Sequence, residues 1–543
     1  MLLNRPENFP EHINVSKGEF VNWSKEISEN DIWICSPEKV GEITEVVNWA
    51  YSHDYKVKAK GASHNWSPLN ISPLLDDKNR IIFIDTRKSI VNVSINEKNT
   101  PVTVTAETGI TMDALCDFLE DKGYGFNSMP APGDLTLGGV LAINGHGTSV
   151  LSTEEKRVPG QVFGSLSNAI ISLKAIVWDN LSESYILREF NRNEADISVL
   201  LTNLGRIFIV EATLQVMQNP RLLCESIFHL SADELLGKES KTSLSTFINK
   251  SGRVEVIWFP FTENPWLKVW TIAPQKPFLA RKVSSPYNYP ITDNIPEVLS
   301  DLIGLIQGSA PELTPLFGKT QYSITSSSVN LTLSSEIWGW SKNVLHYIKP
   351  TTLRMTANGY AILTRRSNIQ NILYSLSRNH SAMLEKYARE GKYPINGPVE
   401  IRITGLDYLS DLDIASNVEP SLSALKKVAD RPDIDCAIWF DVLTMPGTSG
   451  AEEFYAELEE WIYNQFNTDT SIVRVEWSKG WAYTSSKAWA NNDVIRNKIP
   501  ASYITNGNND EWNDCMQKLT QFDPHGVFLT QFVNQLLKPT DLQ

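Results

Sequence analysis

Two glycine-rich segments, each with a histidine, are the parts of this chain of 543 residues best suited to hold an anionic ligand. The first is Lys60-Gly61-Ala62-Ser63-His64-Asn65-Trp66, and the second is Pro132-Gly133-Asp134-Leu135-Thr136-Leu137-Gly138-Gly139, which continues to Asn144-Gly145-His146-Gly147-Thr148. Glycines clustered in this way let backbone N–H groups close around an anion such as a pyrophosphate. Either loop alone is as well explained by a tight surface turn, but two loops with a histidine in each favour a shared ligand site.

A glutamate and an arginine two residues apart form a second candidate site. In residues 399–404, strand alternation puts Glu400 and Arg402 on one face, with their Cα atoms roughly 6.5 to 7 Å apart. If that face lines an apolar cavity, each charge is tolerable mainly because the other is near. The carboxylate could then take a proton from a substrate hydroxyl while the arginine stabilises negative charge. The simpler alternative is an exposed ion pair on an outer sheet face.

Glu255 and Lys479 are further charged residues among apolar ones. Alternation in residues 253–261 places Glu255 with Arg253 and Ile257, and Glu255 could pair with Arg402 as a movable gate. A structural carboxylate at a sheet edge explains Glu255 equally well. For Lys479, the alternative to a site residue is a solvated surface lysine.

Common nucleotide, hydrolase and zinc motifs are absent. Gly318-Lys319-Thr320 is similar to the end of a P-loop, but Leu313 stands where the first glycine is required. No GxSxG, HExxH or GxGxxG sequence occurs. The five cysteines are widely spaced without a CxxC pair, so neither a metal site nor a dense disulfide framework is predicted, and most cysteines should be buried apolar residues.

The composition is that of a globular protein of two or three domains, with 42% hydrophobic and 21% charged residues. Its net charge of −14 and the scattered positions of Lys and Arg argue against a nucleic-acid partner. No apolar run approaches the roughly 20 residues of a membrane span, and the chain as given begins without the order of residues typical of a signal peptide.

The order of predicted elements indicates an α+β protein. A helix is expected to start at Ser36-Pro37, followed by a strand at 56–60, a strand at 102–106 and a helix opened by Thr111. From about residue 220, longer alternating segments predict a second domain built on a large antiparallel sheet covered by helices. The last stretch, with an amphipathic segment at 529–537, is expected to return to the first domain.

The two glycine loops, in this order, resemble the flavoproteins of the vanillyl-alcohol oxidase type. The segment Gly205-Arg206-Ile207-Phe208-Ile209-Val210-Glu211 looks like the strand that closes their FAD domain. The resemblance implies an FAD domain of two subdomains, with His64 as the residue that bonds covalently to the flavin. The residues it implies for FAD binding are Lys60, Gly61, Ala62, Ser63, His64, Asn65, Asp134, Thr136, Gly138, Gly139, Asn144, Gly145, Gly147, Ile209 and Lys479.

Residues 253–261, 398–405 and 476–481 narrow the resemblance to the bacterial cholesterol oxidases with covalent flavin. That family oxidises a 3β-hydroxysteroid with O2, releases hydrogen peroxide and usually moves the ring double bond from Δ5 to Δ4. The resemblance implies Glu400 as the base, with Arg402 and Glu255 beside it. It also implies an FAD domain at 1–217, a substrate domain at 218–490 and a C-terminal segment at 491–543.

Two alternatives stay open. Oxidases of alditols or aldonolactones share the fold, but the related lactone oxidases carry a histidine where Glu476 precedes Trp477 and Lys479. A binding protein that keeps the fold without flavin is the other. The resemblance further implies a secreted or periplasmic bacterial enzyme, a hydrophobic sterol as partner and at most transient contact with a membrane surface.

Overall fold

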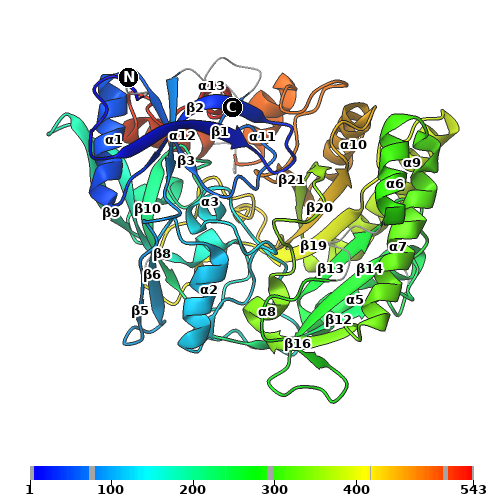
Figure 1. Ribbon diagram of the computed structural model, residues 1–543. Coiled ribbons are helices and arrows are strands. Elements are labelled where there is room, and N and C mark those ends of the chain that lie inside the picture. The colour runs from blue at the N-terminus through cyan, green and yellow to red at the C-terminus, as the bar shows by residue number, and fades with distance from the viewer. Residues whose placement is uncertain are drawn as a thin grey trace.

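The N-terminal half of the molecule contains two small sheets with helices packed beside them (Figure 1). The computed structural model describes residues 5–72, 80–238, 240–289, 297–415, 417–504 and 511–540. One sheet has the order β1-β2-β4-β3, with β1 (Asn14–Val21), β2 (Ser28–Ser36), β3 (Lys56–Lys60) and β4 (Ile81–Asp85). The other has the order β5-β6-β10-β8-β9, with β5 (Val93–Asn96), β6 (Thr103–Glu107), β8 (Ile170–Asp179), β9 (Ser184–Asn191) and β10 (Phe208–Gln215). The helices of this half are α1 (Val40–Ser52), α2 (Met112–Asp121) and α3 (Leu137–Ala142).

One ten-stranded sheet forms the framework of the second half. Its order is β15 (Arg281–Lys282), β16 (Glu336–Trp340), β12 (Arg221–Ile227), β14 (Trp266–Ile272), β13 (Val254–Trp258), β19 (Val399–Gly405), β20 (Cys436–Thr444), β18 (Tyr360–Thr364) and β21 (Ser471–Val475), with β17 (Thr356–Ala357) paired to β20. All its pairs are antiparallel except β15 with β16. The α+β class with a large, essentially antiparallel sheet is therefore confirmed.

The remaining helices follow in chain order: several lie along this sheet, and those near the C-terminus pack against the first half (Figure 1). They are α4 (Ala232–Leu236), α5 (Leu244–Ser251), α6 (Glu297–Gly308), α7 (Thr314–Leu331), α8 (Ser341–Leu345), α9 (Ile369–Arg389), α10 (Ala451–Phe466), α11 (Ile499–Ala501), α12 (Glu511–Phe522) and α13 (Gln531–Leu536). A short ribbon of β7 (Tyr124–Gly125) and β11 (Met217–Gln218) marks the passage between the halves. Within the described ranges, no helix combines the length and the apolar character needed to cross a membrane.

The helix start predicted at Ser36-Pro37 is wrong. Ser36 ends β2, where it pairs with Asn14, and α1 begins at Val40 with Lys39 in the N-cap position. Because the strand ladder holds Ser36, its hydroxyl is not placed to cap a helix. The start predicted at Thr111 is confirmed, since its hydroxyl accepts a hydrogen bond from the Ala114 N–H at 3.2 Å. All five cysteines are buried and free.

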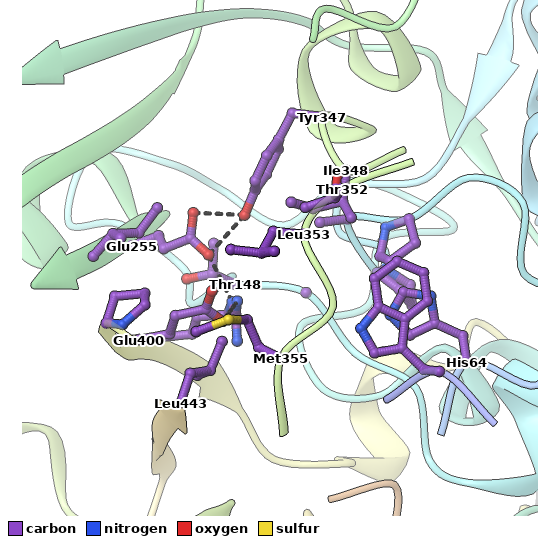
Figure 2. Close-up of a pocket in the computed structure, with 18 of the residues that line it drawn as sticks. His64, Thr148, Glu255, Tyr347, Ile348, Thr352, Leu353, Met355, Glu400 and Leu443 are labelled. Atoms are coloured by element: carbon purple, nitrogen blue, oxygen red, sulfur yellow. Dashed lines mark hydrogen bonds and ion pairs between the residues drawn. The ribbon is translucent and has the colours of Figure 1, made fainter. Parts of the chain in front are cut away.

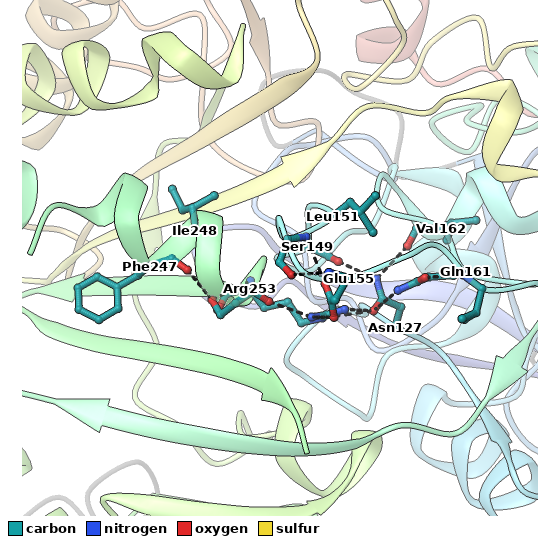
Figure 3. A network of polar contacts seen from close by, with 12 residues as sticks. Asn127, Ser149, Leu151, Glu155, Gln161, Val162, Phe247, Ile248 and Arg253 are labelled. Atoms are coloured by element: carbon teal, nitrogen blue, oxygen red, sulfur yellow. Dashed lines mark hydrogen bonds and ion pairs between the residues drawn. The ribbon is translucent and has the colours of Figure 1, made fainter. Parts of the chain in front are cut away.

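A buried polar network fixes the second half against the first (Figure 3). Arg253, just before β13, is fully buried, and its guanidinium contacts Glu155 at 2.9 Å and the Asn127 side-chain oxygen at 3.2 Å. The Asn127 amide donates to the Ser149 hydroxyl at 2.6 Å. Since Ser149 follows the second glycine loop, this network holds that loop beside β13.

The C-terminal residues 511–540 pack against the first half. The Val57 N–H donates to the Val527 carbonyl at 2.8 Å, so the chain after α12 runs beside β3. Asp523 is fully buried, forms an ion pair with Arg206 and accepts a hydrogen bond from the Tyr185 hydroxyl. The Val527 and Phe528 N–H groups also donate to this carboxylate. Asp523 thus ties the C-terminal segment to β9 and to the turn just before β10.

Replacing Asp523 by alanine tests this tie. Asp523→Ala leaves Arg206 buried without its partner, a change that typically costs about 3–5 kcal/mol of unfolding free energy. Denaturant unfolding followed by tryptophan fluorescence measures the loss. Asp54→Ala, which breaks the exposed pair with Arg80, serves as the control and should leave the unfolding midpoint unchanged. Equal unfolding midpoints for the two variants would contradict a stabilising role of Asp523.

Candidate active site

A cavity of about 340 Å³ lies between the two halves of the molecule. Its wall includes His64 from the first half and Glu255, Glu400 and Arg402 from the large sheet. Figure 2 shows Glu255 and Glu400 at one side of this cavity and His64 at the other. A second cavity of about 130 Å³ runs along the first glycine loop. The two cavities adjoin, because four residues line both of them: His64, Leu135, Val140 and Ile143.

The structure distributes the predicted ligand-binding residues over both cavities. Those that line the second cavity are Lys60, Gly61, Ala62, Ser63, His64, Asn65, Thr136, Gly138, Gly139 and Ile209. Those that line the main cavity are Asn144, Gly145, Gly147 and Lys479. Asp134 lines neither, since the wall there is formed by Leu135, the next residue. The Asp134 carboxyl is half-buried, and its burial raises its pKa.

The two glycine loops touch each other. A Cβ atom on Gly61 would lie 2.5 Å from the Thr136 hydroxyl oxygen, so only glycine permits this approach. Thr136 also caps α3, where its hydroxyl accepts from the Gly139 N–H. In each loop a residue other than glycine takes the left-handed conformation, Ser63 with φ 56° and Asn144 with φ 64°. The two loops therefore form one continuous surface along the adjoining cavities.

His64 is held between aromatic rings at the junction of the cavities. Its imidazole stacks on Trp23 with the ring centroids 3.7 Å apart, and the edge of Trp66 lies 5.8 Å away. Burial, with Lys479 and Arg354 nearby, lowers the pKa of His64 to about 3, so the ring is neutral at pH 7. Its Nδ1 atom is buried and has no hydrogen-bond partner among the described residues. A neutral histidine with a free ring nitrogen therefore faces the ligand space.

Strand register brings the charged residues onto one face of the large sheet. Glu255 of β13 lies directly opposite Arg402 of β19, and Glu400 lies opposite Asp441 of β20. Paired residues in an antiparallel sheet share a face, so these four side chains point to the same side. Lys268 of β14, opposite Glu255, extends the row.

Arg402 is the centre of this cluster. Its guanidinium contacts Glu255 at 2.8 Å, Glu400 at 2.5 Å and Asp441 at 3.1 Å. Burial disfavours its charge, but Glu400 and Glu255 outweigh that effect and raise the pKa of Arg402. Three carboxyl groups thus hold one cation that stays charged inside the cavity.

Glu255 has further partners that do not depend on Arg402. The Tyr347 hydroxyl donates to its carboxylate at 2.6 Å (Figure 2). The Lys268 ammonium lies 3.4 Å from the same carboxylate. Burial opposes the charge, yet Arg402 and Lys268 hold the pKa of Glu255 below its usual value. Glu255 therefore stays ionised and is an integral part of the site, not a carboxylate at a sheet edge.

Asp441 links this cluster to the segment around Lys479. Its Oδ2 atom lies 3.7 Å from the Lys479 ammonium. Burial and the charge of Glu476 raise the pKa of Asp441, whereas Lys479 and His146 outweigh burial at Glu476 and lower its pKa. Asp441 therefore holds a proton more readily than Glu476 does.

His146 lies against this pair of carboxyls. Its ring stacks on Trp439 with centroids 3.7 Å apart, and its Nε2 atom is 3.7 Å from Glu476. The packing on Trp439 fixes the orientation of the His146 ring, and the residue also lines the main cavity.

Several residues of the site were not found in the sequence. Asp441 and Lys268 stand alone among apolar residues of buried strands, and this isolation could have marked them. The apolar wall left no such signal, because an amphipathic helix does not reveal what it faces. It comes from α6, from α7 and from the segment before β17: Leu299, Ile303, Phe317, Thr325, Val329, Tyr347, Leu353 and Met355. Among the described residues, no cluster suited to a metal ion occurs.

Solved structures share this architecture over almost the whole chain. A solvent-stable cholesterol oxidase is 44% identical with a TM-score of 0.96, and the match covers 98% of this chain and 100% of that one. Cholesterol oxidase from Brevibacterium sterolicum is 40% identical with a TM-score of 0.94, covering 98% and 99%.

Curated proteins give more distant matches. L-gulonolactone oxidase of Mus musculus is 26% identical over 254 residues, which are 45% of this chain and 50% of the relative. D-arabinono-1,4-lactone oxidase of Candida glabrata is 26% identical over 259 residues, 47% of this chain and 45% of the relative. The matched segment thus spans about half the length of these curated relatives.

The first half fits FAD. Residues 33–155 match the family of FAD binding domains. The adjoining cavities suit an elongated dinucleotide, with the glycine loops along one part and the free Nδ1 of His64 at the junction. Residues 221–538 match the family described as cholesterol oxidase, substrate-binding. The chain therefore belongs to the cholesterol oxidase family, with an FAD-binding domain preceding the substrate-binding domain that defines it.

Proposed function

We propose that the protein oxidises a 3β-hydroxysteroid such as cholesterol, with O2 as electron acceptor and hydrogen peroxide as product. The observation that carries this proposal is the ion-paired Glu400 and Arg402 set in a cavity with apolar walls from α6 and α7. A steroid would bury its rings against those helices and present its hydroxyl to the charged row. A sugar lactone, favoured only by the distant match to lactone oxidases, would leave those walls unused.

When bound, FAD would supply the hydride acceptor for the alcohol carbon, with O2 as the final electron acceptor. Glu400 takes the hydroxyl proton. It is a carboxylate in the cavity wall, and its ion-pair partner is the Arg402 cation rather than a second carboxyl. Arg402 stabilises negative charge on the substrate oxygen. The same Glu400 carboxylate could move a proton from C4 to C6 during an isomerisation.

Arg402 can leave Glu255 without stranding a buried charge. Tyr347 and Lys268 remain beside Glu255, and Glu400 and Asp441 remain beside Arg402. Movement of the Arg402 side chain away from Glu255 therefore leaves no buried charge unpaired. This supports the gate expected from the pairing of these two residues.

The finer cofactor proposal is a covalent bond between His64 and the flavin. Neutral His64 keeps a lone pair on a ring nitrogen, and its stacking on Trp23 fixes the orientation of the ring. The secreted or periplasmic location implied by the family stays a prediction.

Substrate choice tests the proposed function. With cholesterol delivered in cyclodextrin we expect flavin reduction and hydrogen peroxide release, and with L-gulonolactone or xylitol we expect neither. Peroxide release, measured with a coupled peroxidase, separates these outcomes. Turnover of the polar compounds alone would favour a lactone or alditol oxidase, and a colourless protein without turnover would favour a binding protein.

Glu400→Gln tests the base. Glutamine keeps the size of the side chain but cannot take a proton, so anaerobic flavin reduction by sterol should slow by about 10²- to 10⁴-fold. Stopped-flow absorbance without O2 measures this rate. Glu385→Gln, on the exposed side of α9, is the matched control and should reduce flavin at the parental rate. If Glu400→Gln also does so, the base lies elsewhere, and Glu255 is the next residue to test.

His64→Ala tests the covalent bond. We expect the parental protein to keep its yellow colour after acid precipitation and His64→Ala to release FAD into the supernatant, because the bonding nitrogen is gone. His12→Ala, which changes an exposed histidine, should retain acid-stable flavin. Acid-stable flavin in His64→Ala would exclude this attachment residue.

A further inference from the structure

Four exposed apolar side chains gather at one end of the large sheet. Phe278 and Leu279 lie in the loop between β14 and β15 with exposed fractions of 94% and 81%. Leu331, the last residue of α7, and Leu333, just after it, have exposed fractions of 85% and 77%. Figure 1 shows the first of these loops projecting beyond β16. We call these four residues the apolar tip. Exposed apolar groups in such a cluster mark a contact surface.

Hydrogen bonds join the two loops of the apolar tip. The Arg281 guanidinium donates to the Thr332 carbonyl at 2.8 Å, and β15 pairs with β16 directly after the first loop. The loops are therefore held together as one prominence.

Lys276 makes the first loop suited to an apolar medium. Its ammonium donates to the carbonyls of Pro277, Phe278 and Ala280 at 2.9, 3.2 and 2.8 Å. Backbone carbonyls that enter lipid without a partner cost several kcal/mol each. Because Lys276 satisfies these carbonyls from within the loop, Phe278 and Leu279 can be immersed without exposing them.

The charges around the apolar tip are basic. Lys276, Arg281 and Lys282 are exposed, whereas the carboxylates on the adjoining strands, Glu225 and Glu336, are half-buried opposite each other. β15 and the loop before it thus gather three cations beside the exposed apolar residues. The chain as a whole has a net charge of −14, so this local cluster of positive charge is opposite in sign to the protein.

The chain on both sides of the apolar tip leads into the main cavity. Val329 lines that cavity two residues before Leu331, and Tyr289 lines it ten residues after Leu279. Whatever binds the apolar tip would therefore lie next to chain segments that form the cavity wall.

We propose that the apolar tip docks the enzyme on a lipid surface, with Phe278, Leu279, Leu331 and Leu333 inserted and the three cations at the headgroups. This rests on the proposed function, because a sterol substrate resides in lipid. A second copy of the chain is the other possible occupant, but two such tips would bring their basic residues together.

Vesicle binding of the intact, flavin-loaded protein tests the proposal. The probe is a vesicle of phosphatidylcholine and phosphatidylglycerol, prepared with and without cholesterol, and the bound fraction is measured by flotation. We expect the double variants Phe278→Ser/Leu279→Ser and Leu331→Ser/Leu333→Ser each to bind at least about tenfold more weakly, with or without cholesterol. Leu181→Ser is the matched control, since Leu181 is 96% exposed in the turn between β8 and β9.

Sterol turnover separates docking from catalysis. Turnover of cholesterol in cyclodextrin should equal the parental rate in both double variants, whereas turnover of vesicle cholesterol should fall with binding. Parental vesicle binding in both double variants would overturn the proposal, as would a change of oligomeric state with vesicle binding unaltered. If the parental protein binds vesicles through the tip but oxidises no sterol, docking stands and the proposed function fails.

Discussion

A buried charge needs an opposite charge beside it, and the arrangement around Arg402 meets that constraint. Three cations, Lys268, Arg402 and Lys479, lie among the carboxyls of Glu255, Glu400, Asp441 and Glu476. Full ionisation would leave one negative charge in excess. Burial and the charge of Glu476 raise the pKa of Asp441, and a proton on this carboxyl would remove that excess.

Individual contacts in this cluster can change, because its charged groups have several partners each. Arg402 contacts three carboxyls, and Glu255 has Arg402, Tyr347 and Lys268 as partners. Loss of the contact between Arg402 and Glu255 therefore leaves neither group alone. A site with a single ion pair would have no such reserve, because an unpaired buried charge costs several kcal/mol. The cluster thus supports both a fixed base at Glu400 and a movable cation at Arg402.

Local patterns predicted what depends on neighbours in the sequence. The glycine loops, the shared face of Glu400 and Arg402, and the α+β class follow from backbone freedom and from strand alternation. The pairing of Glu255 with Arg402 was proposed from the same alternation, and the register of β13 with β19 places these residues opposite each other. Asp441 was not found, since its place depends on β20 pairing with β19 across 39 residues of chain. The helix start at Ser36 failed for the same reason, because pairing with β1 decided it.

The apolar walls lay beyond sequence reasoning because α7 buries residues and exposes others on one continuous helix. Phe317 and Val329 line the cavity, whereas Leu316 and Leu331 are exposed. Periodicity accounts for Leu316, which lies on the outer face next to a buried residue. It does not account for Leu331, which ends the helix and is held near the loop after β14 by the β15–β16 pair and by the hydrogen bond from Arg281 to Thr332. A substrate that is insoluble in water gives this exposed end a use, since the same helix that would hold the sterol also ends at the surface that would meet its source.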